Sequence, residues 1–161
     1  MRKGFEEWFP RYMQEALGMK LDSPIFKSGA LAIVGIGILG AFVAGYMSDK
    51  VFGARRPPVA FIGYAIIVAC LAVIMGGPSL TMLIVAFSLN SLAISMVHSM
   101  LSGTASMDFG GKRAAATAAG MFDGMQYVGQ SFVGWGMGML LDHFGWGAWG
   151  SSMLGFAAVG A

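Results

Sequence analysis

The stretch Gly45–Arg56, GYMSDKVFGARR, is a short polar segment between two long apolar runs. It carries one acid, Asp49, and three cations, Lys50, Arg55 and Arg56, and two prolines follow it directly. Lys and Arg collect on the cytoplasmic side of short membrane loops, and proline is tolerated in the first turn of a helix. The stretch therefore predicts a cytoplasmic turn between two membrane-spanning helices, and it sets which way the chain faces.

The composition agrees with a membrane protein. The 161 residues are 57% hydrophobic and 11% charged, and the mean hydropathy is +0.70. A soluble domain has about 25% charged residues, so the composition predicts a polytopic helical membrane protein. Cys70 is the single cysteine, which excludes a disulfide within the chain.

Four apolar runs are long enough to cross about 30 Å of hydrocarbon. A polar and aromatic segment before them and a shorter apolar run after them are expected to be parts of two further spans. Complete spans are expected at 25–47, 58–75, 80–102 and 114–141, and partial ones at 2–17 and 147–161. Each span must be a helix, because lipid satisfies no backbone polar groups. The aromatic cluster of Trp8, Phe9 and Tyr12 in the first partial span is of the kind found at the membrane–water boundary.

Basic residues alternate between the expected loops. The loops 48–57 and 106–113 hold five Lys and Arg residues, whereas 76–79 and 142–147 hold none. This pattern follows the positive-inside rule and places the first two loops on the cytoplasmic side.

A polar stripe marks the expected span 114–141. Asp123 lies ten residues beyond Arg113, about 15 Å of helix rise, near the midplane of the hydrocarbon core. Gln126, Tyr127 and Gln130 follow at spacings that place them on the same helix face. An acid at this depth faces a cavity or a partner, so the stripe predicts a solute-facing surface; the alternative is a buried acid that only joins two helices.

Asn90 and His98, in the expected span 80–102, are weaker candidates for the same cavity. A histidine within the membrane serves more often as an interhelix hydrogen-bond partner than as a proton carrier. Other chemistry is disfavoured: no spacing of His, Cys and acids indicates a metal, a cofactor or an enzyme. The loops hold too few basic residues to form a nucleic-acid-binding surface.

Three segments together resemble a known transporter family. GYMSDKVFG is similar to the loop signature of the major facilitator superfamily, with a spacer before Gly53 that is one residue longer than usual; Gly45, Asp49, Lys50, Gly53, Arg55 and Arg56 match its positions. DFGGKRAAATAAGMFDGMQYVGQ at 108–130 and LDHFGW at 141–146 look like the carboxy-terminal half of the organophosphate:phosphate antiporters of that superfamily. The resemblance implies an all-α bundle, from the end of helix seven to the start of helix twelve, and alternating access around a midplane site.

The resemblance also assigns the amino-terminal segment. RKGFEEWFPRYM at 2–13 is similar to a stretch of family helix seven, which places Arg2 at the position of a substrate-binding arginine. A guanidinium suits phosphate because it is always charged and donates paired hydrogen bonds. Lys3 stands where the family has an aromatic residue, so the local geometry departs from the pattern.

The function implied is exchange of an organic phosphate, such as glycerol 3-phosphate or a sugar phosphate, for inorganic phosphate across the plasma membrane. Arg2, Asp123, Gln126, Tyr127 and Gln130 would contact substrate, and the Gly45–Arg56 segment would act as a conformational latch. The amino-terminal half is an expected partner, and we expect no transport without it. Two alternatives stay open: a sugar-phosphate sensor on the same fold, and a proton-coupled facilitator for another solute.

Overall fold

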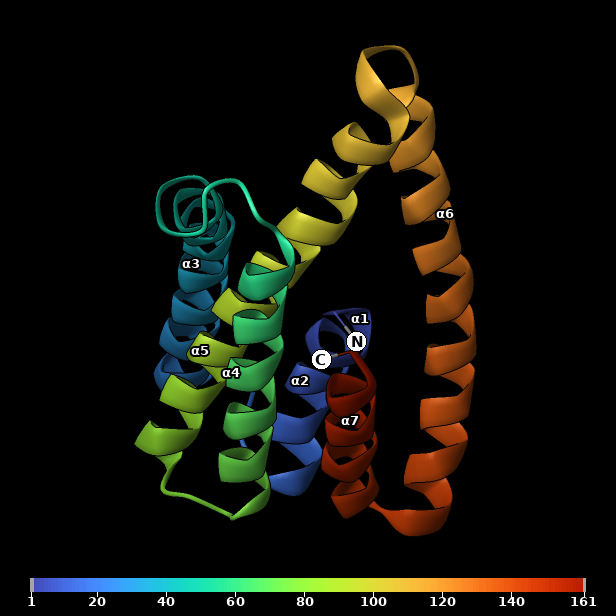
Figure 1. The fold of residues 1–161 in the computed structure, drawn as a ribbon. Helices are drawn as coiled ribbons and strands as arrows, with labels where there is room; N and C mark the ends of the chain where they lie inside the picture. The colour runs from blue at the N-terminus through green and yellow to red at the C-terminus, as the bar shows by residue number, and fades with distance from the viewer. Residues whose placement is uncertain (1, 161) are drawn as a thin grey trace.

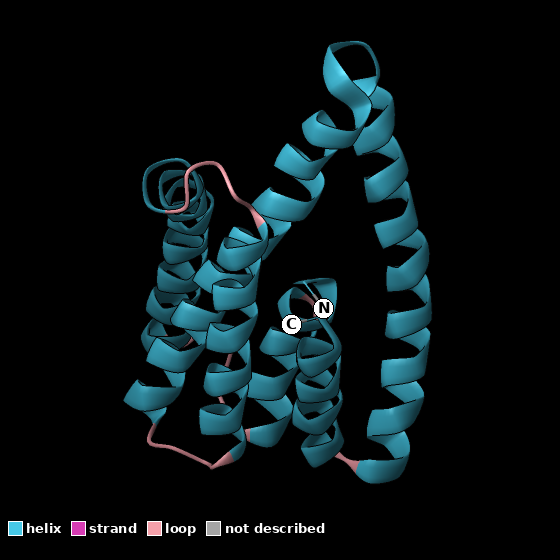
Figure 2. Cartoon of the chain, viewed as in Figure 1, coloured by secondary structure: helices cyan, strands magenta, loops and turns pink. Residues whose placement is uncertain are grey.

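The structure is a computed structural model that describes residues 2–160, with the side chains of 2, 3, 103–105 and 109–113 left undescribed. All regular structure in that range is helical (Figures 1 and 2). The elements are α1 (Arg2–Glu6), α2 (Trp8–Arg11), η1 (Tyr12–Ala16), α3 (Pro24–Tyr46), η2 (Met47–Val51), α4 (Pro57–Met75), α5 (Leu80–His98), η3 (Ser99–Thr104), α6 (Ala105–Phe144) and α7 (Trp146–Gly160), where η marks a π-helical turn.

Local sequence explains where the long helices begin and end. The Ser23 hydroxyl accepts a hydrogen bond from the Phe26 backbone N–H at 3.3 Å and caps α3, and α4 begins with two prolines. Between α4 and α5, Gly77 takes a φ of +64°, which glycine adopts without steric cost. These caps and turns leave long uninterrupted helices packed side by side (Figure 1).

Helices α3 and α5 approach each other closely through small residues. Gly29, Gly37 and Gly40 are buried on α3. A methyl group on Gly37 would lie 2.6 Å from the Ser91 hydroxyl, and one on Gly40 would overlap the Leu92 carbonyl oxygen. Glycine at these positions permits the close packing that joins helices in membranes, where no hydrophobic force between helices operates.

An aromatic cluster joins the amino-terminal helices to the rest of the bundle. Phe9 is buried and lies 4.7 Å from Phe87 of α5 between ring centroids, and Tyr12 lies 5.3 Å from Trp149 of α7. The fully buried Trp149 donates its indole N–H to the Gly4 carbonyl oxygen at 3.2 Å. The rings of Trp8, Phe9 and Tyr12 thus hold α2 and η1 against α5 and α7, because stacked and edge-on ring pairs stabilise packing. Their place at the membrane–water boundary stays a prediction.

Two expected loops are mostly helical. The segment 106–113 lies inside α6, which is helical from Ala105 onward, and the expected loop 142–147 is reduced to Gly145, with φ +72°, between α6 and α7. Charged residues at a helix end do not interrupt a helix, and sequence polarity alone misplaces such boundaries. In Figure 1, η3 forms the apex that joins α5 to α6.

In the part of the chain that the structure describes, three helical segments are long and apolar enough to cross a membrane: Pro24–Val51, Pro57–Met75 and Leu80–Asp108. They confirm the prediction of an all-α membrane protein. Helix α6 has 40 residues and is long enough to cross, but it is not among the three segments that hydropathy selects within the described residues. Its polar residues, including Asp123 and Gln126, lower its hydropathy, and its role as a fourth complete span stays a prediction.

Candidate functional site

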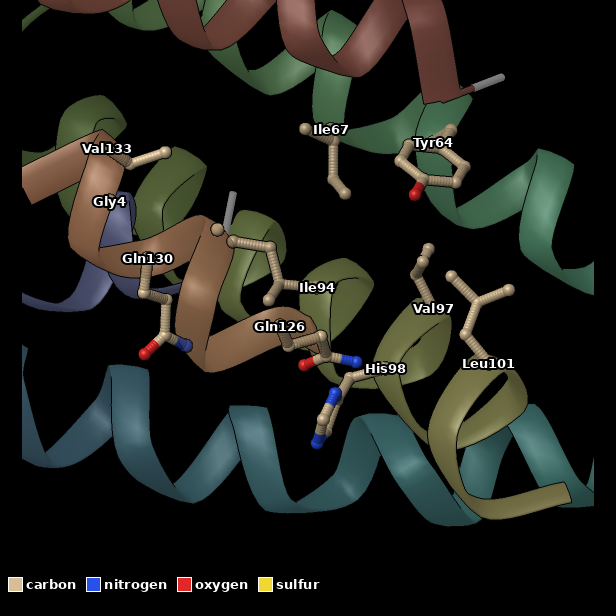
Figure 3. A pocket seen from close by; sticks show the side chains of 11 residues that line it. Gly4, Tyr64, Ile67, Ile94, Val97, His98, Leu101, Gln126, Gln130 and Val133 are labelled. Atoms are coloured by element: carbon tan, nitrogen blue, oxygen red, sulfur yellow. The ribbon is translucent and has the colours of Figure 1, made fainter. Parts of the chain in front are cut away.

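A cavity of about 330 Å³ lies between four helices of the bundle (Figure 3). Its wall is made by α1, α4, α5 and α6 with Leu101 of η3, and most of its lining is apolar. The lining residues are Gly4, Tyr64, Ile67, Ile94, Val97, His98, Leu101, Gln126, Gly129, Gln130 and Val133. A mostly apolar cavity with a few convergent polar groups is the usual form of a small-molecule site.

Four side chains bring hydrogen-bonding groups to this cavity. Gln126 and Gln130 come from successive turns of α6, His98 from the end of α5, and Tyr64 from the middle of α4. In Figure 3 the Gln126 and His98 side chains project toward the same region of the cavity, and Tyr64 lies across from them. None of the four carries a fixed charge, so together they suit hydroxyl and ether oxygens better than a bare anion.

The His98 ring is held by its own helix. The Ser102 hydroxyl, one turn further along, donates to the His98 carbonyl oxygen at 2.9 Å and lies 3.3 Å from the ring Nδ1. A half-buried ring with a neighbour at this distance is oriented before any ligand arrives, which lowers the entropic cost of binding.

The remaining residues of the predicted binding set lie elsewhere. Asp123 and Tyr127 are exposed on α6 and are not among the cavity-lining residues. The Arg2 side chain lies outside the described residues, although α1 supplies Gly4 to the wall of the cavity. The structure thus brings Gln126 and Gln130 together, while the roles of Arg2, Asp123 and Tyr127 stay predictions.

The segment Gly45–Arg56 contains a π-helical turn. Gly45 lies in the last turn of α3, and the exposed Asp49 and Lys50 lie in η2. A π-helical turn, with hydrogen bonds from i to i+5, holds more residues than an α-helical one. Gly53 then reverses the chain at a φ of +57°.

An ion pair joins this segment to the start of α6. Arg56 donates from Nε to Asp108 Oδ2 at 2.5 Å and from Nη2 to Oδ1 at 3.2 Å. The Arg56 side chain is 26% exposed and the Asp108 side chain is 51% exposed. The contact places the segments 48–57 and 106–113 at the same end of the bundle, which the alternation of loop charges requires.

Sequence reasoning missed Tyr64 and Asp108. Tyr64 is the one residue of α4 able to donate a strong side-chain hydrogen bond. This contrast with its apolar neighbours could have marked Tyr64 as a candidate site residue. Asp108 lies within the DFGGKR segment, but nothing in the sequence shows that it faces Arg56, because the pairing depends on how α4 and α6 pack.

Comparison with known proteins places the chain in a family. The Major Facilitator Superfamily profile matches residues 3–134. The chain belongs to this superfamily of transporters and is a multi-pass membrane protein.

The chain is also similar to individual proteins, over about a third of the length of each. The chain is 30% identical to a glycerol-3-phosphate transporter of Bacillus subtilis over 91% of its own length and 33% of that protein. It is 29% identical, over the same shares, to the membrane sensor protein UhpC of Escherichia coli. A phosphoglycerate transporter protein of Salmonella typhimurium is 30% identical over 91% of this chain and 31% of that protein.

These relatives confirm the resemblance to the organophosphate:phosphate antiporter family. The chain spans about a third of the length of the curated relatives it matches. No solved structure matches it significantly.

Proposed function

We propose that the chain is the carboxy-terminal bundle of a secondary transporter that exchanges an organic phosphate for inorganic phosphate by alternating access. The observation that carries this proposal is the cavity where Gln126, Gln130, His98 and Tyr64 meet between four helices. Two of the similar proteins are named as transporters of glycerol 3-phosphate and phosphoglycerate, which are hydroxylated or carboxylated carbon chains with one phosphate.

Neutral and charged side chains bind different parts of the substrate. The neutral amides of Gln126 and Gln130 receive the hydroxyl-bearing part of the substrate, since each amide both donates and accepts hydrogen bonds. Arg2 binds the phosphoryl group, for which a guanidinium has matching geometry and charge. Asp123 and Tyr127 continue the same stripe of α6 and meet the substrate, with Asp123 tuning coupling or recognition of the carbon chain, when the amino-terminal half completes the cavity.

The Gly45–Arg56 segment acts as a latch at the cytoplasmic end. The Arg56–Asp108 pair joins α4 to α6, and such a pair stabilises the conformation in which the two helices are close. The protein lies in the plasma membrane with the segments 48–57 and 106–113 in the cytoplasm, as the positive-inside rule predicts.

The test is exchange in proteoliposomes that contain the assembled transporter, this chain together with the amino-terminal half. We expect external glycerol 3-phosphate or a hexose phosphate to drive efflux of internal radiolabelled phosphate. Arg2→Ala should abolish exchange, and Arg2→Lys should restore part of it, because a lysine keeps the charge but loses the paired donors. Undiminished exchange by Arg2→Ala would refute the role assigned to Arg2.

A sensor is the second candidate, because UhpC is named a membrane sensor protein and is about as similar as the transporters. A sensor would bind the organic phosphate but give no phosphate efflux from the same vesicles. Uptake that follows an imposed pH gradient and ignores phosphate would instead indicate a proton-coupled facilitator.

A further inference from the structure

A second hollow, which shares Tyr64 and Leu101 with the polar cavity, opens at the end of the bundle that carries Gly45–Arg56. It encloses about 820 Å³ between the first turns of α4 and the segment where α5 passes through η3 into α6. We call it the rim groove, and its lining residues are Ala54, Arg55, Arg56, Pro57, Pro58, Ala60, Phe61, Tyr64, Met100, Leu101, Asp108 and Gly160.

The floor of the rim groove is apolar and uncovered. Phe61 is 58% exposed and Leu101 is 45% exposed, from α4 and η3 respectively. Both segments belong to helices that are long and apolar enough to span a membrane. Apolar side chains that are exposed on membrane-spanning helices contact lipid acyl chains, because their contact with water would be unfavourable.

The rim of the groove is basic. Arg55, Arg56 and Asp108 are its charged lining residues, which leaves one net positive charge. Asp108 accepts two hydrogen bonds from Arg56, whereas Arg55 is exposed and forms no ion pair with any described carboxylate. The groove is therefore lined both by apolar side chains and by a guanidinium that no described carboxylate neutralises.

We propose that the rim groove binds an anionic phospholipid. Its phosphate accepts hydrogen bonds from the Arg55 guanidinium, and one acyl chain lies along Phe61 and Leu101. A freely dissolved phosphate would leave the apolar floor exposed, and a zwitterionic lipid would bring its own cation against the basic rim. A single lipid with net negative charge satisfies both surfaces, and basic pockets between membrane helices are where such headgroups bind.

The test measures lipid binding to the purified chain in detergent, by native mass spectrometry, with phosphatidylglycerol and phosphatidylcholine of identical acyl chains. We expect phosphatidylglycerol to bind at least fivefold more tightly. Arg55→Ala should weaken phosphatidylglycerol binding about fivefold, the change expected for one basic residue at a membrane surface. Lys50→Ala is the matched control, since Lys50 is an exposed cation of the same segment that does not line the groove.

A second variant tests the floor. Phe61→Ser should weaken binding of both lipids without changing the preference between them, and circular dichroism should show unchanged helicity for each variant. Equal retention of the two lipids, or equal losses in Arg55→Ala and Lys50→Ala, would overturn the proposal, because either result means charge attraction without a site. Displacement of the lipid by free glycerol 3-phosphate would also overturn it and would identify a site for a water-soluble anion.

Discussion

Arg56 and Asp108, 52 positions apart in the chain, are joined by two parallel hydrogen bonds between a guanidinium and a carboxylate. The pair connects the first residue before α4 to the first turn of α6. It is the described contact that brings the two basic segments of the chain together.

Removing this pair should change transport more than stability. Asp108→Asn is expected to lower the free energy of unfolding by about 1 kcal/mol or less, because both side chains are partly exposed to solvent. In the assembled transporter the same variant should change the exchange rate severalfold, since the latch biases a conformational equilibrium. The exchanged pair Arg56→Asp with Asp108→Arg should restore the rate; failure of this rescue with unchanged folding would argue against the latch.

Substituting Gly40 should separate α3 from α5. Gly40→Ala is expected to destabilise the bundle by about 1–3 kcal/mol, because the new methyl group overlaps the Leu92 backbone oxygen, which cannot rotate away. Gly35→Ala on the same helix is the control, because nothing lies within 4 Å of that position. That variant should be neutral or stabilising by up to about 1 kcal/mol. Thermal midpoints in detergent measure both, and equal midpoints would contradict the packing.

The backbone of the turn after η2 is strained at Ala54, and a substitution can relieve this strain. Ala54 has a φ of +64°, which costs an L residue about 1–2 kcal/mol, while glycine adopts it freely. Ala54→Gly should stabilise the chain by about 0.5–1 kcal/mol once the greater freedom of glycine in the unfolded state is subtracted. Gly53→Ala, at a φ of +57°, should destabilise it by a similar amount. A shift of the same sign in both variants would contradict the turn geometry.

The two glutamines of the cavity should contribute to affinity. Gln126→Met and Gln130→Met keep the shape of the side chain but remove its hydrogen bonds, and each should weaken glycerol 3-phosphate binding about fivefold to tenfold. Ser131→Ala is the control, because that exposed hydroxyl bonds only to the Tyr127 carbonyl oxygen of its own helix. Calorimetry on the assembled transporter gives the dissociation constants. Unchanged affinity in both glutamine variants would place the site elsewhere.

Trp149 should be intolerant of a conservative change. Trp149→Phe keeps a ring in the core but leaves the Gly4 carbonyl oxygen without its indole donor, at a cost of about 1–3 kcal/mol. Trp135 is 69% exposed, so Trp135→Phe should stay within about 0.5 kcal/mol of the wild type. Unfolding monitored by the remaining tryptophans distinguishes the two variants.

The class of the protein followed from the sequence because hydrophobic runs and loop charges are local properties. Runs of apolar residues predicted the helices that became α3, α4 and α5, since the membrane allows few other structures. The start of α6 was misplaced because a basic pair inside a helix looks the same as one in a loop. The packing of Phe9 against Phe87 and of Tyr12 against Trp149 was not predictable from the sequence, because it depends on α5 and α7, which are distant in sequence.

The candidate site was only partly predictable for a related reason. Helical spacing grouped Gln126 and Gln130 with Asp123 and Tyr127, and only the two glutamines line the cavity, because spacing defines a face of α6 and not what that face meets. His98 and Tyr64 line the same cavity from two other helices. Their proximity to the glutamines depends on how α4 and α5 pack against α6. Tertiary contacts of this kind leave no periodic signal in a single sequence.

The hydrogen bond from Trp149 to Gly4 spans 145 positions, and this separation constrains biogenesis. While the ribosome is still making α6, the aromatic rings of α1 and α2 have no Trp149 to pack against. The rings of α1 and α2 therefore stay without this partner until α7 has been inserted.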